Sequence, residues 1–414
     1  MNILWLKTEL LHPVDKGGKI RTYGMLKELR RDHRITYLTL DAGAPNEAVE
    51  KAEEYCHELI RVPHSLPEKF SFRFYADLLA NATSALPYAL RAYRSDSMTQ
   101  AISEKTSSGA VDILVCDFLT PSVNLPERLR IPTLLFQHNV EALIWRRHHQ
   151  EQRNPFKKAY LWLEWHKMRA AEAQECRRYD RVVAVSRRDA EELEVGYRLT
   201  DVADVSTGVD VDYFSSSGKV EIDPFEIVFT GSMDWLPNRD AVGFFLDGVL
   251  PSLVRSIPAV HLTVVGRNPP SGLVERAKTD AHLTVTGFVD DVRPFVERAA
   301  VFVVPIRIGS GTRLKIFEAM SMGTPVVSTT VGAEGLPLKA GEDILIADEP
   351  EGFVRAIEML LKEPDQAREF GSRSADLVRS NFGWHGVSKQ FSSICEEVVM
   401  DFIEKRDVEV GGDG

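Results

Sequence analysis

The chain has 414 residues, of which 44% are hydrophobic and 27% are charged, and it carries a formal net charge of −11. This composition is typical of a soluble globular protein with room for two ordinary domains, and the acidic excess argues against binding along a nucleic-acid backbone. The four cysteines lie far apart without a CxxC pair, which argues against a structural zinc site or a disulfide scaffold and favours a reducing cytosol.

Predicted strands alternate with helical patterns from the first residues onward. The opening segment MNILWLKTELLHP meets a charge at Lys7, so it predicts a strand rather than a signal peptide. No apolar run approaches the ~20 residues of a membrane-spanning helix, and we therefore expect a cytoplasmic protein. Apolar runs without strict alternation are typical of parallel sheets that are buried on both faces. The predicted strands are residues 2–7, 34–40, 58–63, 112–117, 132–139, 181–186, 226–232, 261–266, 283–288, 301–306, 325–330 and 343–348.

The strand rhythm is interrupted once, in the serine-rich segment DYFSSSGKVEIDPFE. Six strands on either side predict an α/β protein with two Rossmann-like, doubly wound domains that face a central cleft, rather than one large α/β domain with a helical tail. The predicted divisions are an N-terminal domain at 1–214, a C-terminal domain at 215–378, a helix at 379–407 that packs back toward the N-terminal domain, and a frayed tail at 408–414.

The segment RIGSGTRLKIFEAMSMGTPVV, residues 307–327, is the first candidate binding site. Ligands of open α/β sheets bind at the carboxyl ends of strands, and this segment follows a strand there. Gly309 and Gly311 would let backbone amides approach a ligand, and the helix is predicted to begin at about Thr312. Arg313 and Lys315 place cations at the positive end of that helix, which favours a diphosphate as the partner.

Further along the same predicted helix, Glu318 would suit the two hydroxyl groups of a ribose, because a carboxylate accepts two hydrogen bonds. Leu314, Phe317 and Met320 are spaced to face the sheet. The alternative interpretation is an ordinary turn followed by an exposed Lys315–Glu318 pair, which would contribute only tenths of a kcal/mol.

The stretch GSGTRLKIFEAMSMGTPVVST resembles the nucleotide-sugar motif of family 4 glycosyltransferases, which are retaining enzymes of GT-B fold. Segments in the order of that family extend over most of the chain. They are DKGGKIRTYGMLKEL, QHNVEA, VSRRDAEEL and STGVDVDYF in the first half, and GSMDWLPNRDAV, VGRNP, TGFVDDVRPF and TTVGAEGL in the second.

The resemblance implies a role for each matching residue in binding a nucleoside-diphosphate sugar. Arg313 and Lys315 would steady the leaving diphosphate, Glu318 would hold the ribose, and the backbone near Phe288 and Val289 would receive the base. An ordinary strand-to-helix turn remains an equal alternative for the two glycines after the first strand. The other residues that the resemblance implies for the donor are Gly17, Gly18, Gly231, Ser232, Arg239, Arg267, Ser310, Gly311 and Thr312.

The sequence departs from the family at two places. Ser310 stands where many relatives have a second glutamate that touches sugar hydroxyls, and the loop GSMDWLPNR offers only Arg239 where relatives carry more cations. We therefore expect Arg313 to carry more of the phosphate role, and the sequence assigns no donor sugar.

His138 follows a predicted strand, and the resemblance implies that it touches the transferred sugar or the acceptor. A strand-end histidine bonded to backbone is the alternative, and Glu141 either orients this ring or starts a helix. No metal-ligand spacing is present, because Asp290 and Asp291 are adjacent, and we expect these two to cap a short helix. The family mechanism is then a same-face transfer in which the departing phosphate helps take the acceptor's proton.

Residues 143–181 hold ten Lys or Arg against five Asp or Glu, with aromatic residues interleaved, and residues 69–94 are similarly basic and aromatic. These segments could rest on an anionic membrane and meet a lipid-linked acceptor, or they could be helices whose aromatic side chains enter the core. The aromatic residues of the longer segment are Trp145, Phe156, Tyr160, Trp162 and Trp165.

The sequence thus predicts a metal-independent retaining glycosyltransferase that needs no cofactor. It would move a sugar to a glycan or lipid-linked acceptor, in the setting of bacterial surface polysaccharides that the resemblance implies. An isomerase of the sugar-nucleotide 2-epimerase type and a non-catalytic nucleotide-sugar sensor are the alternatives.

Overall fold

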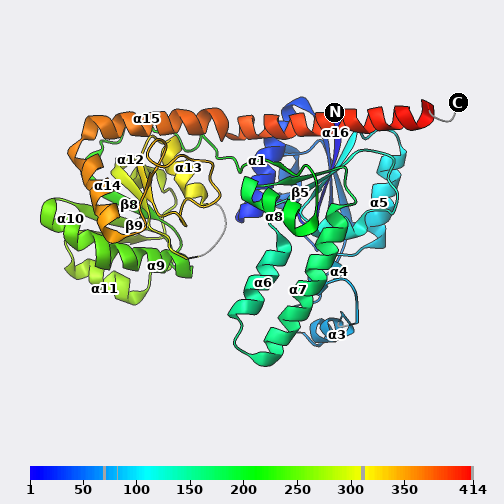
Figure 1. The fold of residues 1–414 in the computed structure, drawn as a ribbon, viewed down its shortest axis with the longest axis horizontal. Helices are drawn as coiled ribbons and strands as arrows, with labels where there is room; N and C mark the ends of the chain where they lie inside the picture. The colour runs from blue at the N-terminus through cyan, green and yellow to red at the C-terminus, as the bar shows by residue number, and fades with distance from the viewer. Residues whose placement is uncertain (69–70, 82, 309–312, 412–414) are drawn as a thin grey trace. The chain divides into compact units, whose positions relative to one another are not determined.

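The computed structural model describes residues 1–68, 71–81, 83–308 and 313–411. The chain forms two compact units (Figure 1). The N-terminal unit contains Met1–Ser206 and Val387–Gly414, and the C-terminal unit contains Thr207–Gly386.

The N-terminal unit is built on a seven-stranded sheet of order β3-β2-β1-β4-β5-β6-β7 among the described residues, and every strand pair in it is parallel. Its central strands are buried because they consist of apolar residues with helices on both sides of the sheet. The strands are β1 (Asn2–Lys7), β2 (Arg34–Asp41), β3 (Glu58–Pro63), β4 (Ile113–Asp117), β5 (Thr133–Gln137), β6 (Arg181–Ala184) and β7 (Ala203–Asp204).

Helices connect these strands. They are α1 (Gly17–Asp32), α2 (Asn46–Glu50), η1 (Lys51–Glu54), α3 (Phe72–Asn81), α4 (Tyr88–Arg91), α5 (Asp96–Ser107), η2 (Thr120–Asn124), α6 (Glu141–Glu151), α7 (Pro155–Cys176) and α8 (Arg187–Tyr197).

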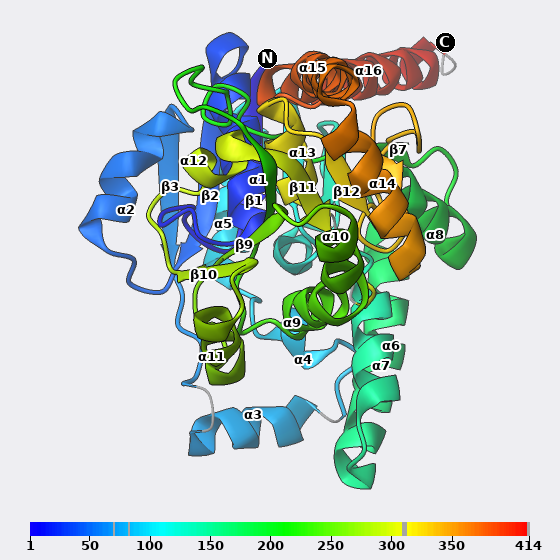
Figure 2. The same cartoon turned by 90° about the vertical axis from the view of Figure 1, so that its left-hand side faces the viewer.

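The C-terminal unit repeats this plan with a six-stranded parallel sheet of order β10-β9-β8-β11-β12-β13 in the described part of the chain (Figure 2). The strands are β8 (Asp223–Thr230), β9 (His261–Val265), β10 (Leu283–Gly287), β11 (Ala299–Val304), β12 (Val326–Ser328) and β13 (Leu345–Ile346). The helices are α9 (Leu236–Phe244), the π-helix η3 (Phe245–Val249), α10 (Leu250–Ser256), α11 (Ser271–Thr279), α12 (Arg293–Arg298), α13 (Leu314–Ser321), α14 (Pro350–Lys362), α15 (Pro364–Asn381) and α16 (Trp384–Gly411).

The predicted strands are confirmed, since each of the twelve apolar runs overlaps one of the strands β1–β6 or β8–β13. The sequence missed β7, which has only two residues. Two units with separate sheets also exclude the single large α/β domain.

The division between the units lies at 206/207, before the predicted division at 214/215. Backbone pairing explains the difference, because the N–H of Val209 donates to Phe382 O at 2.8 Å and Val209 bridges to Gly383. Ser216 and Ser217 also donate to the Glu297 carboxylate, at 2.7 and 2.9 Å. This segment therefore packs within the C-terminal unit.

The end of the chain consists of two helices where the sequence predicts one at 379–407. The predicted helix is interrupted between the end of α15 and the start of α16. Since α16 continues to Gly411, residues 408–411 are helical rather than frayed. The part of α16 from Val387 onward belongs to the N-terminal unit, where Phe391 packs against Trp5 and Phe136 with ring centroids 5.6 and 5.0 Å away. Within the described residues, no helix combines the length and apolar character needed to span a bilayer.

Candidate active site

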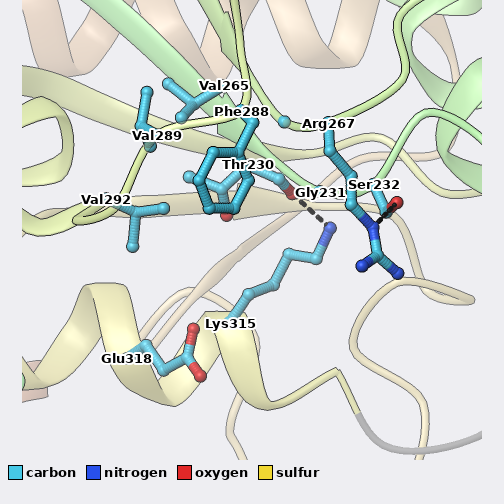
Figure 3. A pocket seen from close by; sticks show the side chains of 11 residues that line it. Thr230, Gly231, Ser232, Val265, Arg267, Phe288, Val289, Val292, Lys315 and Glu318 are labelled. Carbon is cyan, nitrogen blue, oxygen red and sulfur yellow. Dashed lines mark hydrogen bonds between the residues drawn. The ribbon is translucent and has the colours of Figure 1, made fainter. Parts of the chain in front are cut away.

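The C-terminal unit contains a pocket of about 380 Å³ at the carboxyl ends of β8, β9 and β10, closed on one side by the start of α13 (Figure 3). Its position follows from the parallel sheet, in which loops after neighbouring strands meet at one edge. The pocket is lined by Thr230, Gly231, Ser232, Val265, Gly266, Arg267, Phe288, Val289, Val292, Lys315 and Glu318.

Two glycines allow the loops after β8 and β9 to approach each other. A Cβ atom on Gly266 would lie 1.9 Å from Gly231 O, and a Cβ atom on Gly231 would lie 2.6 Å from Asn238 Nδ2 and 2.9 Å from Lys315 Nζ. No other residue type fits at these positions without displacing backbone or the Lys315 side chain. The loops at the pocket floor can therefore approach this closely only because Gly231 and Gly266 have no side chain.

Lys315 is half-buried and fixed by hydrogen bonds to the loop after β8. Its Nζ atom donates to Thr230 O at 2.5 Å and to Asn238 Oδ1 at 3.3 Å, and it lies 4.5 Å from the centroid of the Phe229 ring. Burial lowers the pKa of Lys315 to about 7, although the charge of Glu318 opposes that shift. An anionic ligand in the pocket would therefore stabilise the protonated form of Lys315.

Glu318 lies one turn further along α13, on the same wall of the pocket. Burial raises the pKa of its carboxyl to about 7, with Lys315 acting in the opposite direction. The structure therefore does not show the exposed surface pair of the alternative interpretation, because both side chains line a cavity and both are half-buried.

The cations of the donor motif lie at different places. Arg267, which follows β9, lines the pocket and donates from Nε to Ser232 Oγ at 3.0 Å. Arg239 is an exposed residue of α9 outside the pocket lining. Arg313 is 5% exposed beside Trp235, with its guanidinium 5.1 Å from the ring centroid, and burial lowers its pKa. The predicted contributions of Ser310, Gly311 and Thr312, and of Gly309, lie outside the described residues.

The loop after β10 forms an apolar wall of the pocket. Phe288 is 72% exposed and stands beside Val289 and Val292. Just beyond, Asp291 accepts the backbone N–H of Arg293 at 2.9 Å, but the N-cap residue of α12 is Val292, so neither aspartate occupies the predicted cap position. Among the described residues we find no such bond for Asp290. Within the same part of the chain, no group of three or more His, Cys, Asp or Glu side chains is placed to hold a metal ion.

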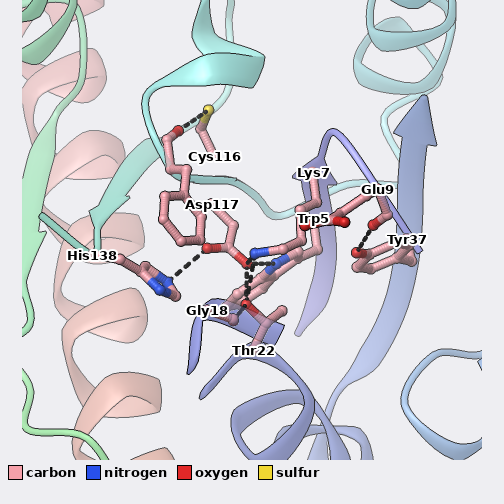
Figure 4. A network of polar contacts seen from close by, with 10 residues as sticks. Trp5, Lys7, Glu9, Gly18, Thr22, Tyr37, Cys116, Asp117 and His138 are labelled. Atoms are coloured by element: carbon pink, nitrogen blue, oxygen red, sulfur yellow. Dashed lines mark hydrogen bonds and ion pairs between the residues drawn. The ribbon is translucent and has the colours of Figure 1, made fainter. Parts of the chain in front are cut away.

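In the N-terminal unit, His138 lies directly after β5 and is 4% exposed (Figure 4). Its Nε2 atom is 2.8 Å from Asp117 Oδ1, so its partner is a carboxylate rather than backbone. Glu141 starts α6, where its N–H donates to Glu172 Oε1 at 2.8 Å, and burial beside Glu172 raises the pKa of Glu141 to about 7.

Asp117 was not among the functional residues predicted from the sequence. A signal was present, because Asp117 ends β4 and the strand beside it leads directly to His138. Gly17 and Gly18 form the first turn of α1, where a Cβ atom on Gly18 would lie 2.7 Å from Phe118 Cζ while Gly17 has open space. Close packing thus explains Gly18, and it leaves Gly17 accessible.

Comparison with known proteins agrees with this architecture. A family model described as Glycosyltransferase Family 4 matches residues 16–213, and one described as Glycosyl transferases group 1 matches residues 224–363. A phosphatidyl-myo-inositol mannosyltransferase of Mycobacterium tuberculosis is 28% identical over 210 residues, which cover 48% of this chain and 55% of that protein. A lipopolysaccharide core biosynthesis mannosyltransferase of Rhizobium leguminosarum is 26% identical over 247 residues, which cover 54% and 66% of the two chains.

Solved structures of similar fold extend over nearly the whole chain. Sucrose-phosphate synthase from Thermosynechococcus elongatus has a TM-score of 0.66 at 16% identity and covers 97% of this chain and 100% of its own. The Anabaena protein HepE in complex with UDP has a TM-score of 0.62 at 11% identity, with 96% and 100% covered. Because family matches fall on both units in chain order and each unit has its own parallel sheet, this chain belongs to the family 4 glycosyltransferases and has the GT-B fold.

Proposed function

We propose that the protein is a retaining, metal-independent glycosyltransferase that moves a sugar from a nucleoside-diphosphate sugar to a glycan or lipid-linked acceptor in bacterial polysaccharide or glycolipid biosynthesis. The observation that carries this proposal is the pocket in which Lys315, Glu318 and Arg267 converge. A nucleoside diphosphate has a charged group, a hydroxyl pair and an aromatic base, and this pocket offers a suitable partner for each.

The diphosphate would lie against Lys315 and Arg267, because both cations border the pocket and their positive charge stabilises the charge that develops on the leaving group. Glu318 would accept hydrogen bonds from the ribose hydroxyls, and the exposed ring of Phe288 would contact the base. HepE, a neighbour in fold, is described in complex with UDP-glucose, which supports a nucleotide sugar as the donor.

In the proposed reaction, the bond between the anomeric carbon and the diphosphate oxygen breaks, and the acceptor oxygen bonds the same carbon from the same face. The proton of the acceptor hydroxyl passes to an oxygen of the departing diphosphate. Positive charge at Lys315 and Arg267 supports this departure, so the scheme needs no metal ion. The mycobacterial and rhizobial relatives, a phosphatidyl-myo-inositol mannosyltransferase and a lipopolysaccharide core mannosyltransferase, support a glycolipid or glycan acceptor.

The first test is the thermal midpoint of the purified protein with UDP, GDP, ADP or CMP, each with EDTA present. A nucleotide that binds only the folded protein at 100 times its Kd adds ~2.7 kcal/mol of stability, so the shift is easily measured. Release of nucleoside diphosphate from the matching sugar donor and an acceptor then identifies a transferase. Formation of an epimeric donor without release would identify the isomerase instead, and the absence of any nucleotide response would overturn the proposal.

We further propose that α3 and α7 rest on an anionic membrane when the enzyme meets a lipid-linked acceptor. The aromatic residues of this region divide into two sets, because Trp145 and Trp165 pack against the core whereas Phe156 is 86% exposed. On α3, Phe72 is 91% exposed, and Lys167 of α7 donates to Asn81 O at the end of α3 at 2.7 Å. Exposed apolar side chains beside basic residues favour insertion at a lipid headgroup boundary.

Flotation with vesicles of anionic and of neutral lipids tests this membrane contact. The anionic vesicles should carry the protein, and the double variant Phe72→Ser with Phe156→Ser should remain in solution. Val195→Ser is the matched control, because Val195 is 83% exposed on α8 of the same unit. Equal behaviour of wild type and double variant would reject the contact.

A further inference from the structure

A buried network of polar side chains lies beside His138 in the N-terminal unit (Figure 4). Its centre is Asp117, which has no exposed surface. Asp117 Oδ2 accepts hydrogen bonds from Trp5 Nε1 at 3.0 Å, Lys7 Nζ at 2.8 Å and Thr22 Oγ1 at 2.6 Å. The other oxygen, Oδ1, faces His138 Nε2 at 2.8 Å. Three donors thus occupy one side of the carboxylate, and the histidine occupies the other.

The protonation states of this pair follow from burial and charge. Burial lowers the pKa of His138 to about 3 although Asp117 opposes the shift, so the ring is neutral at physiological pH. Burial alone would raise the pKa of Asp117, but Lys7 and His138 together hold it well below its ordinary value. A neutral imidazole beside an ionised carboxylate must place its hydrogen on the nitrogen that faces that carboxylate.

The second ring nitrogen, Nδ1, is buried and has no partner among the described residues, whereas Nε2 has only the 2.8 Å approach to Asp117 Oδ1, which is not a hydrogen bond of ordinary geometry. Buried polar atoms are nearly always paired, so an unpaired acceptor in a buried polar network indicates a site for a further group. We propose that Asp117 is a positioning residue that fixes His138 as the Nε2–H tautomer, so that Nδ1 accepts a hydrogen bond from a hydroxyl group of the sugar or the acceptor. The hydroxyl partner rests on the proposed function, whereas the tautomer does not.

Packing prevents the His138 ring from rotating so that its other nitrogen faces Asp117. Phe118 stacks on the ring with centroids 3.9 Å apart, and Phe136 meets it edge-on at 4.6 Å. Lys7 Nζ lies 4.3 Å from the centroid of Phe118, and Gly18 provides the space that the Phe118 ring occupies. These aromatic neighbours hold the ring with Nε2 toward residue 117. The side chain at position 117 therefore determines whether Nε2 or Nδ1 carries the hydrogen.

The same geometry predicts what Asp117→Asn does. The amide oxygen should face the three donors of Trp5, Lys7 and Thr22, because an amide NH2 group there would be a fourth donor among them and would take away the acceptor of Trp5 Nε1. Lys7 and Thr22 would keep only the hydrogen bonds from Lys7 to Thr22 Oγ1 and from Thr22 to Gly18 O. The NH2 group then faces His138 and donates to Nε2. This substitution therefore moves the ring hydrogen to Nδ1 and converts the free acceptor into a donor.

The first measurement is made on the full wild-type chain, labelled with 15N in its 11 histidines, at neutral pH. Two-bond 1H–15N spectra distinguish the tautomers, and His138→Gln assigns the signals by their loss. We expect a protonated Nε2 and a bare Nδ1 at His138. A doubly protonated ring, or a hydrogen on Nδ1, would overturn the proposal without any variant of Asp117.

The second measurement compares Asp117→Asn with Asp180→Asn. Asp180 accepts from Thr133 N and Oγ1, both at 2.8 Å, at the opposite end of β5, so its substitution perturbs the same strand without touching His138. We expect the tautomer to reverse only in Asp117→Asn, with nucleoside-diphosphate release in the presence of acceptor about ten-fold or more slower and KM for the donor little changed. An unchanged tautomer with unchanged release would reject the positioning role.

The outcomes separate this inference from the proposed function. If the wild type shows the Nε2–H tautomer but releases no nucleoside diphosphate from any sugar donor, the proposed function fails while the assignment of Asp117 stands. If release is normal but the tautomer is wrong, only the positioning role fails. A poorly folded Asp117→Asn variant would leave the wild-type spectrum to decide.

Discussion

The polar network around Asp117 in the N-terminal unit and the Lys315–Glu318 pair in the C-terminal unit differ in how many hydrogen-bond partners their buried charged groups have. In the N-terminal unit, Oδ2 of the Asp117 carboxylate accepts three hydrogen bonds, one of them from Lys7 at 2.8 Å, and Oδ1 lies 2.8 Å from His138 Nε2. In the C-terminal unit, burial moves the pKa values of both Lys315 and Glu318 to about 7, and the Glu318 carboxylate accepts no hydrogen bond among the described residues.

This difference indicates a division of labour between rigid support and ligand binding. A buried charge with a complete set of partners holds geometry, because removing any partner leaves another group unsatisfied. A buried charge with few partners gains most from a ligand that supplies them. We therefore expect substitutions in the C-terminal pocket to change nucleotide affinity strongly. The size of each loss should show how much that residue contributes to nucleotide binding.

The largest effect is expected for Lys315→Met. This change removes a half-buried cation that a diphosphate would neutralise, which should weaken nucleoside-diphosphate binding by about 100-fold or more. Titration calorimetry with the nucleotide that stabilises the wild type measures the loss. Lys278→Met, an exposed position on α11 of the same unit, is the control and should bind normally. Unchanged affinity in Lys315→Met would show that the pocket is not the diphosphate site.

A smaller effect is expected for Arg267→Ala, because this arginine is exposed at the pocket rim and solvent weakens its charge. We expect affinity for the nucleoside diphosphate to fall about five- to ten-fold. Arg239→Ala removes the arginine that the sequence favours on the loop after β8, yet it should change affinity less than about two-fold because Arg239 lies outside the pocket lining. The reverse ranking would mean that Arg239, rather than Arg267, binds the diphosphate.

The contrast between Arg239 and Arg267 shows what could be predicted from the sequence. Strands were predictable because buried parallel strands are continuous apolar runs, and the loop residues that follow them were predictable because such loops meet at one edge of the sheet. Gly231, Lys315 and Glu318 therefore fall in one pocket as expected. Both Arg239 and Arg267 were predicted to bind the donor, and only Arg267 lines the pocket, because the side of α9 on which Arg239 lies is not revealed by loop composition.

Asp117 illustrates the same limit in the N-terminal unit. Its contact with His138 depends on the register of β4 against β5, in which Asp117 pairs with Phe136. A carboxylate at the end of an apolar strand could equally have faced solvent. The division between the units was displaced for a similar reason, because the pairing of Val209 with Gly383 joins segments far apart in the sequence.

A further prediction concerns pH, because nucleotide binding needs Glu318 without its proton and Lys315 with its proton. Below about pH 7, Glu318 gains a proton and becomes a poorer acceptor for the ribose, and above about pH 7, Lys315 loses its charge. Nucleotide affinity should therefore be greatest near neutral pH and fall by at most about ten-fold per pH unit on either side. Bound diphosphate raises the pKa of Lys315, so the alkaline decline should level off.

Measurement of Kd from about pH 5.5 to about pH 8.5 tests this profile, with Glu318→Gln as the discriminating variant. The terminal phosphate of the nucleotide also gains a proton near pH ~6, which alone would weaken binding in acid. Glu318→Gln should lose only the part of the acid decline that the carboxyl causes and should keep the alkaline decline. A flat profile in the wild type would mean that neither group titrates in contact with the ligand.

The smallest expected effect concerns the stability of the protein without nucleotide. Burial raises the folded-state pKa of Glu318 to about 7 from a model-peptide value of 4.5, so the folded protein binds this proton more tightly than the unfolded chain does. Stability therefore falls as pH rises from 4.5 to about 7, and the cost of the buried charge is fully present above that window. Glu318→Gln removes the charge at nearly constant shape. We expect it to raise the free energy of unfolding at about pH 8 by about 1 kcal/mol, or the midpoint by about 2–4 °C, with a smaller gain at about pH 5.

Glu351→Gln, on the exposed first turn of α14, should leave the midpoint nearly unchanged and serves as the control. The loss of attraction between Glu318 and Lys315 acts against the gain, which keeps the expected effect small. If Glu318→Gln instead lowers the midpoint at about pH 8, the carboxylate has sufficient partners without a ligand. The two clusters would then be equivalent, and the reason for placing nucleotide binding at this pocket rather than at the Asp117 network would be lost.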